Sequence, residues 1–106
     1  MAFSKIPAVI VADLDPSAPV PPGTTVLDVR EQHEWDEGHV PGAVHLPLGD
    51  LPLRASELPK NVRILVVCHS GSRSARATAW LNEAGFEAVN LDGGMVDWSR
   101  AGLPVA

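Results

Sequence analysis

The sequence predicts an α/β domain with a mainly parallel five-stranded sheet and helices on both faces. Short apolar runs of four to six residues alternate with segments of helical spacing, as expected for strands and helices in turn. Residues 64–67 are apolar throughout, as in a strand buried on both faces. The 106 residues suit one domain, residues 1–106, and no repeat, low-complexity tract or linker divides them.

Five strands are predicted from aliphatic and β-branched runs. They cover residues 8–12, 24–29, 43–46, 63–67 and 86–91. Residues 1–23 are the least regular part of the predicted domain. Within them, residues 13–23 hold four of the ten prolines and are expected to form a surface loop after the first strand.

Helices are predicted between the strands. They cover residues 31–37, 47–58 (broken by Pro52) and 72–85, and a closing helix capped by residues 92–94 and running to residue 101. Gly85 suits the left-handed position that ends a helix. The helix residues expected to face the core are Trp35, Leu48, Leu51, Leu58, Ala77, Trp80, Leu81 and Ala84.

Composition and charge narrow the possible partners. The formal net charge is −5 and no polybasic run occurs, so neither nucleic acid nor an anionic membrane is expected as a partner. The apolar run at residues 8–12 is too short for a signal-peptide core or a membrane span. A single cysteine excludes an internal disulfide and a CxxC metal site, and it fits a reducing compartment, so a cytoplasmic location is expected. His39 and His45, with Pro41 between them, do not form a metal-binding helix face.

The one cysteine, Cys68, stands where a thiol is readily activated. It follows the apolar strand 63–67, and a short polar loop then leads into the helix that begins near Ser72. Backbone N–H groups of such a loop converge on the sulfur, the helix dipole adds positive charge, and Arg73 adds a full one. These conditions lower a thiol pKa below its free value of about 8.5. The alternative is a small core residue, but the neighbouring glycine, serines and arginine favour the activated thiol.

Three segments together resemble one known family. Residues 26–31, 34–35 and 38–43 are similar to the first signature of rhodanese domains, and residues 68–74 (CHSGSRS) are similar to their CxxGxRS active-site loop. Residues 91–98 and 101–105 resemble their closing segment. The resemblance implies a single rhodanese-like domain and a thiosulfate sulfurtransferase, in which a cysteine persulfide passes sulfane sulfur to cyanide or a thiol.

The resemblance also implies roles for the loop residues. Cys68 would be the nucleophile and persulfide carrier, with Arg73 as the second catalytic residue that orients the donor's oxyanion. The substrate-binding residues would be His69, Ser70, Gly71, Ser72 and Ser74, with His69 contributing either its side chain or its amide alone. The implied partners are thiosulfate or a persulfide as donor, a thiol or cyanide as acceptor, and a sulfur-relay protein. No cofactor and no metal are implied.

Other charged residues near the motifs have several interpretations. Asp28 and Arg30 are expected to form a structural ion pair, since a thiolate held by a loop and a helix terminus needs no Cys-His-Asp triad with Asp28 and His39. Arg76, about one helical turn after Arg73, would either widen a positive patch or form a surface salt bridge.

Three alternative functions stay open. Cysteine-dependent phosphatases share the architecture but have one more residue between nucleophile and arginine, whereas Cys68 to Arg73 is six residues inclusive. Arsenate reduction meets the same objection. A non-catalytic rhodanese-like binding module is the third, although such modules often lack the cysteine. Because His69 stands where many thiosulfate-using members have arginine, the preferred donor is open as well.

Overall fold

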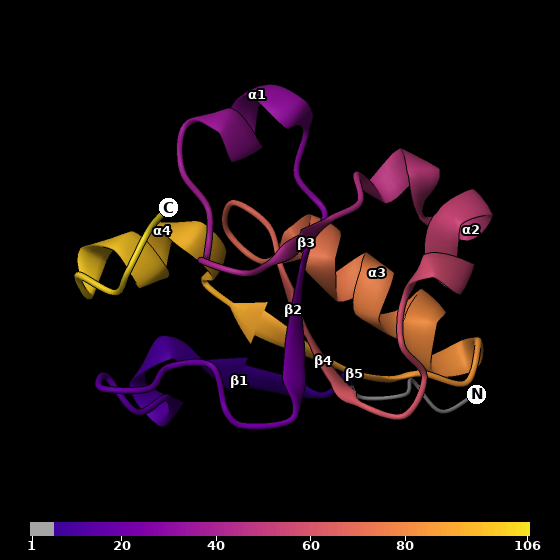
Figure 1. Cartoon of the computed structure of the whole chain (residues 1–106), viewed down its shortest axis with the longest axis horizontal. Helices are drawn as coiled ribbons and strands as arrows, with labels where there is room; N and C mark the ends of the chain where they lie inside the picture. The colour runs from indigo at the N-terminus through magenta and orange to yellow at the C-terminus, as the bar shows by residue number, and fades with distance from the viewer. Residues whose placement is uncertain (1–5) are drawn as a thin grey trace.

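All strands of the sheet run parallel (Figure 1). The computed structural model describes residues 6–106, so residues 1–5 of the predicted domain lie outside the described residues. The strands are β1 (Ala8–Ile10), β2 (Thr24–Asp28), β3 (Val44–His45), β4 (Arg63–Val67) and β5 (Glu87–Asp92). Their order in the sheet is β1-β5-β4-β2-β3, which confirms the predicted five-stranded α/β fold.

Four α-helices connect or follow these strands. They are α1 (Gln32–Asp36), α2 (Leu51–Arg54), α3 (Ser72–Glu83) and α4 (Gly94–Arg100). Single 3₁₀ turns cover Val11–Asp13, Leu48–Asp50 and Ala55–Glu57. Gly85 has φ +95° just after α3, in the left-handed conformation predicted for it.

Strand β4 is the centre of the sheet and positions the loop that follows it. It pairs with β2 on one side and β5 on the other, with Val66 opposite both Leu27 and Asn90. Its last four residues, from Ile64 to Val67, are buried. Because the strands are parallel, the carboxyl ends of β2, β4 and β5 share one edge of the sheet. Ligands of parallel α/β sheets bind beyond that edge, and Cys68 follows β4 there.

Alternate side chains of β4 enter two separate cores. Ile64 and Val66 belong to the core beneath α2 and α3, whereas Leu65 and Val67 pack with residues of α4. Figure 1 accordingly shows α2 and α3 on one side of the central strands and α4 on the other. The prediction of helices on both faces is therefore confirmed, and it explains why the run at β4 is continuously apolar.

Several expectations about the helices are wrong. Trp35 is only half-buried, and no residue of α1 is buried. Its indole stacks on the rings of His39 and His45, with ring centroids 3.5 and 4.7 Å apart. The short α1 lies over the carboxyl edge of the sheet (Figure 1), so this tryptophan covers polar neighbours near the site and does not anchor the core.

The amphipathic pattern of α3 is narrower than predicted. Ala77 and Leu81 are buried, but Trp80 and Ala84 are exposed, and Thr78 is buried instead. The predicted helix 47–58 is replaced by a 3₁₀ turn at residues 48–50 followed by the short helix α2. Pro52 does not break α2, because it lies in the first turn, where a backbone N–H has no partner within the helix. No side chain caps α4, because its N-cap residue is Gly93. Leu51 and Leu58 are buried and Leu48 packs against them, as predicted.

Candidate active site

The sulfur of Cys68 lies in a small nest of hydrogen-bond donors. Cys68 is 1% exposed to solvent. The Gly71 amide donates to Sγ at 3.1 Å, and the Ser74 hydroxyl, buried in the first turn of α3, donates at 3.2 Å. Gly71 reaches this position with φ +112°, a left-handed conformation that suits glycine. The loop therefore folds back over the sulfur as it enters α3.

Two opposing effects set the acidity of this thiol. Burial raises the pKa of Cys68, and hydrogen bonds from the Ser74 hydroxyl and from the amides of Ser74, Gly71 and Arg73 lower it by more. The net pKa of the thiol is therefore below its ordinary value. A larger thiolate fraction at neutral pH makes Cys68 a better nucleophile than a free cysteine.

Helix α4 fixes the first half of the loop. Its Met95 and Val96 amides donate to the carbonyls of Cys68 (2.9 Å) and His69 (3.0 Å). These are N–H groups of a first helical turn, which have no partner inside the helix. The approach is close enough that a Cβ on Gly94, which has φ +53°, would overlap both carbonyl oxygens. The Gly93-Gly94 pair thus lets α4 hold the loop by its backbone.

Arg73 is bound by a carboxylate from a distant part of the sequence. Its two terminal nitrogens donate to the two oxygens of Glu34 in α1, at 2.7 and 2.8 Å, in a bidentate pair. The hydrogen bond from Arg73 lowers the pKa of Glu34 to about 2, and the Glu34 carboxylate raises the pKa of Arg73. The guanidinium nearest the loop is therefore already neutralised by a partner.

A second arginine is bound in the same way, but inside the protein. Arg30 and Asp28 form the predicted ion pair, with a shortest distance of 2.7 Å, and both are buried. Arg30 also donates to the Gly38 carbonyl at 2.8 Å. His45 Nε2 donates to the Arg30 carbonyl at 2.7 Å, so the end of β2 is tied to β3 and to the segment after α1. These contacts account for Asp28 and Arg30 as structural residues.

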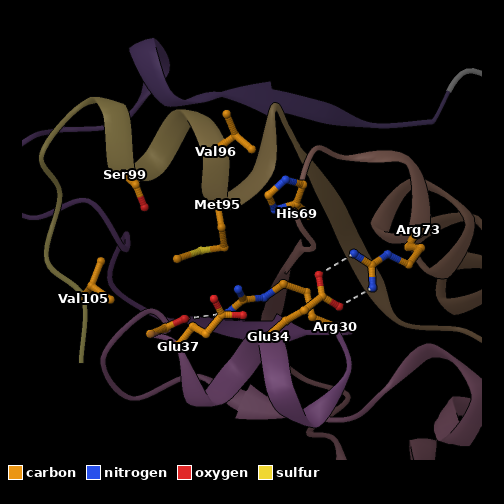
Figure 2. Close-up of a pocket in the computed structure, with 10 residues that line it drawn as sticks. Arg30, Glu34, Glu37, His69, Arg73, Met95, Val96, Ser99 and Val105 are labelled. Atoms are coloured by element: carbon orange, nitrogen blue, oxygen red, sulfur yellow. Dashed lines mark hydrogen bonds and ion pairs between the residues drawn. The ribbon is translucent and has the colours of Figure 1, made fainter.

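An open pocket of about 450 Å³ lies beside the loop (Figure 2). Its floor and walls come from α1, the loop, α4 and the C-terminal residues. The lining residues are Arg30, Glu34, Glu37, Gly38, His69, Arg73, Met95, Val96, Ser99 and Val105. Of the predicted site residues, His69 and Arg73 line this pocket. Ser70 and Ser72 are exposed, whereas Gly71 and Ser74 are buried next to the sulfur.

Residues outside the predicted loop also build the site. Sequence reasoning did not single out Glu34, which binds Arg73, or Asn90 on β5, whose Nδ2 donates to the Gly71 carbonyl at 3.1 Å. It predicted the closing helix α4, but not that the backbone amides of α4 donate hydrogen bonds to the loop. A signal exists for Asn90, because β5 pairs with β4 in the parallel sheet, whereas Glu34 lies on α1 after β2 and no local feature indicates its contact with Arg73. Arg76 is exposed on α3 and lines a different hollow with Trp80.

These features define a class of protein: a parallel α/β domain with a lowered-pKa cysteine in a tight loop between the central strand and a helix. Residues 14–101 match the family described as Rhodanese-like domain. The chain belongs to this family.

Known proteins share both the sequence and the fold. Over 75 residues the chain is 47% identical to a protein of Bacillus subtilis (strain 168) named as a candidate sulfur carrier protein, YrkF; the match covers 70% of this chain and 40% of YrkF. A protein of Allochromatium vinosum named "Sulfurtransferase" is 41% identical over 81 residues, 76% of either chain. The crystal structure of a rhodanese-related protein from Thermoplasma volcanium has TM-score 0.85 and 31% identity, covering 94% of this chain and 97% of that one.

Within residues 6–106 no group of three or more His, Cys, Asp or Glu side chains is arranged to hold a metal ion. None of the helices in the same range is long and apolar enough to span a membrane.

Proposed function

We propose that this domain is a sulfurtransferase that carries sulfane sulfur as a persulfide on Cys68. The observation that carries the proposal is the buried sulfur at the end of β4, which accepts hydrogen bonds from the Gly71 amide and the Ser74 hydroxyl. The names of its relatives, a sulfurtransferase and a candidate sulfur carrier, support a role of this type. The match covers only 40% of YrkF, so the activity of the whole YrkF protein is not assigned to this domain.

The proposed cycle has two displacement steps. The Cys68 thiolate attacks the outer sulfur of thiosulfate, a new S–S bond forms, the old S–S bond breaks, and sulfite leaves with its electron pair. With a persulfide donor the leaving group is a thiolate. A thiolate or cyanide acceptor then attacks the outer sulfur of the Cys68 persulfide, which regenerates the Cys68 thiolate. Neither displacement step needs a redox cofactor or a metal.

The donors that lower the thiol pKa would also hold the persulfide. The second sulfur would extend the charge beyond Sγ, and the amides of Gly71, Arg73 and Ser74 that bind the thiol would stabilise it. His69, Ser70 and Ser72 would bind donor or acceptor at the rim of this nest, and Ser74 would bind the sulfur within it. Arg73 would contribute its amide to the sulfur and its guanidinium to the bound donor.

Donor and acceptor follow from this chemistry as classes. We propose thiosulfate or a low-molecular-weight persulfide as donor, and a thiol, cyanide or the cysteine of a sulfur-relay protein as acceptor. A reducing compartment such as the cytoplasm suits this cycle, because each turn must return Cys68 to the thiolate.

Intact-protein mass spectrometry tests the proposal directly. The protein is treated with thiosulfate, or in parallel with cysteine persulfide, and is desalted without reductant. We expect a gain of one sulfur atom that cyanide removes, and no gain in Cys68→Ser, which lacks the only thiol. The proposal is overturned if neither donor adds sulfur to Cys68, and Cys68-dependent hydrolysis of an aryl phosphate by the wild-type protein would then indicate a phosphatase.

A further inference from the structure

The pocket beside the loop that follows Cys68 is lined by two arginines, and both have carboxylate partners. Arg30 donates to Asp28 and to the Gly38 carbonyl, and Arg73 donates to both oxygens of Glu34. Figure 2 shows the Glu34–Arg73 pair spanning the space between α1 and the loop. A second carboxylate, Glu37, lines the same pocket. An entering anion therefore meets paired cations and acidic neighbours.

The Glu34–Arg73 pair is well formed and partly shielded from solvent. Its side chains are 19% and 32% exposed, and the two bonds are parallel and short. The pKa of Glu34 is about 2, so its carboxylate stays charged at every pH at which the domain would work. An oxyanion that binds Arg73 must first displace this carboxylate or share the guanidinium with it.

The side of the pocket opposite Glu34 is partly apolar, and the space is large. Met95 and Val96 of α4 lie there together with His69 and Ser99, and Val105 lines one end (Figure 2). At about 450 Å³ the pocket falls within the range of roughly 300–1,000 Å³ that is typical of sites for organic ligands. Thiosulfate is a much smaller ion. Removing its two charges from water is costly, and contact with apolar walls offsets little of that cost.

We propose that Glu34 determines donor specificity: by holding Arg73 it disfavours the dianion thiosulfate and leaves the pocket to organic sulfane-sulfur donors with less negative charge. The preferred class is a low-molecular-weight persulfide or thiosulfonate whose carbon end contacts Met95, Val96 and Val105. This inference rests on the proposed sulfurtransferase function and names the substrate class of the same site. Glu34 acts through Arg73 and is a positioning residue, because it is not required to touch the reacting sulfur.

Two matched donors isolate the effect of donor charge. In the methanethiosulfonate anion a methyl group replaces one charged oxygen of thiosulfate. With either donor the Cys68 thiolate bonds to the outer sulfur, the donor's S–S bond breaks, and the electron pair leaves on sulfite or on methanesulfinate. The charge balances in both reactions. The two donors thus react alike and differ at the end that would meet Arg73.

The experiment measures single-turnover sulfur loading of Cys68 by mass spectrometry for both donors, in wild type and in Glu34→Gln. Glutamine keeps the shape of the side chain and removes its charge, which frees Arg73. We expect the second-order rate constant for thiosulfate to rise about tenfold and that for methanethiosulfonate to rise less than about threefold, since the second donor charge gains most from a free guanidinium. A higher thiosulfate constant in wild type than in E34Q, or equal changes for both donors, would overturn the inference.

Two control variants separate release of Arg73 from a general change of charge. Glu37→Gln removes the other pocket carboxylate without freeing an arginine, and it should raise thiosulfate loading less than E34Q does. Glu57→Gln removes the charge of the exposed Arg54–Glu57 pair just after α2, which does not line this pocket, and should leave both constants unchanged. An E37Q effect as large as that of E34Q would contradict the role of Arg73.

Salt dependence gives a test that needs no variant. In wild type, potassium chloride should accelerate thiosulfate loading more than methanethiosulfonate loading, because salt screens repulsion of the dianion by the carboxylates. Slower thiosulfate loading in salt would mean that a free cation attracts the dianion, which contradicts the inference. If neither donor nor cysteine persulfide loads any sulfur, the proposed function itself fails. Loading by both donors without the charge effect rejects the role of Glu34 alone.

Discussion

The Ser74 hydroxyl lies 3.2 Å from the sulfur of Cys68 and also 3.2 Å from the carbonyl oxygen of Gly71. A hydroxyl has one proton to donate, so these two acceptors compete for it. A thiolate is the stronger acceptor, and we infer that ionisation of Cys68 draws the proton of Ser74 toward sulfur. The Gly71 carbonyl keeps its bonds from the Ala75 amide and from Asn90 in either case.

Replacing Ser74 by alanine should therefore make Cys68 less acidic. Hydrogen bonds to charged groups contribute about 1.5–3 kcal/mol, so the loss of this one should raise the pKa of the thiol. The rate of iodoacetamide alkylation as a function of pH measures this shift. Ser72→Ala, at the exposed first position of α3, is the matched control and should leave the inflection in place. An unchanged inflection in S74A would show that the backbone amides alone stabilise the thiolate.

The Glu34–Arg73 pair predicts a defined loss of stability in acid. The pKa of Glu34 falls from 4.5 to about 2 on folding, so its contribution is fully present above pH 4.5 and is lost as the pH falls toward 2. Solvent screening limits the contribution to about 1 kcal/mol. Urea unfolding of wild type and E34Q across this range should show their difference in free energy of unfolding shrinking toward zero. A difference that is independent of pH would assign the stability to packing of α1.

Gly94 should tolerate no side chain. A Cβ there would lie 2.6 Å from the His69 carbonyl oxygen and closer still to that of Cys68, and φ is +53°. Gly94→Ala must push α4 from the loop and break the bonds from Met95 and Val96, at a cost of about 3 kcal/mol or more. Gly85→Ala is the control, since it has φ +95° but nothing within 4 Å of the added atom, and it should cost only about 1–2 kcal/mol. Thermal melts and alkylation rates of both variants compare the two effects, and equal losses would mean that backbone strain alone matters at Gly94.

The sequence predicts the sheet well because its signals are local. Residues 64–67 are continuously apolar as a consequence of burial on both faces, and the turn at Gly85 marks the end of α3 by its left-handed backbone. The thiol pKa was also predicted in direction, because its causes lie within six residues of Cys68. The sequence also predicts that the positive charge of Arg73 lowers the thiol pKa. In the structure the main causes of the lower pKa are the hydrogen bonds from Ser74 and the loop amides.

What the sequence did not predict depends on contacts between distant segments. Glu34 and Arg73 are 39 positions apart, and nothing in either segment indicates that one binds the other. Trp35 was wrongly assigned to the core, because a large aromatic residue on a short helix has no local feature that distinguishes a core position from stacking on His39 and His45. The contact of α4 with the loop likewise depends on how the sheet brings β4 and β5 together.

The length of the active loop provides a prediction that separates sulfur transfer from phosphate chemistry. The carbonyls of Cys68 and His69 are fixed by α4, and Gly71 starts the turn into α3, so Ser70 is the point at which the loop can lengthen. With six residues from Cys68 to Arg73, we expect the nest to admit one sulfur beyond Sγ and to crowd a phosphoryl group with its equatorial oxygens. Wild-type protein should therefore show no Cys68-dependent hydrolysis of an aryl phosphate.

Inserting a glycine after Ser70 tests this argument, because it lengthens the loop without adding a side chain and permits any backbone angle. The inserted residue moves the Gly71 amide away from Sγ, which is now 3.1 Å from it. We expect slower sulfur loading, together with weak aryl phosphate hydrolysis or binding of phosphate-like oxyanions. Circular dichroism and a thermal melt establish that the variant is folded, and a Cys68→Ser version of the insertion accounts for background hydrolysis. Ready hydrolysis of aryl phosphates by the unmodified protein, without uptake of sulfur, would show that loop length does not discriminate and would remove the main argument against a phosphatase.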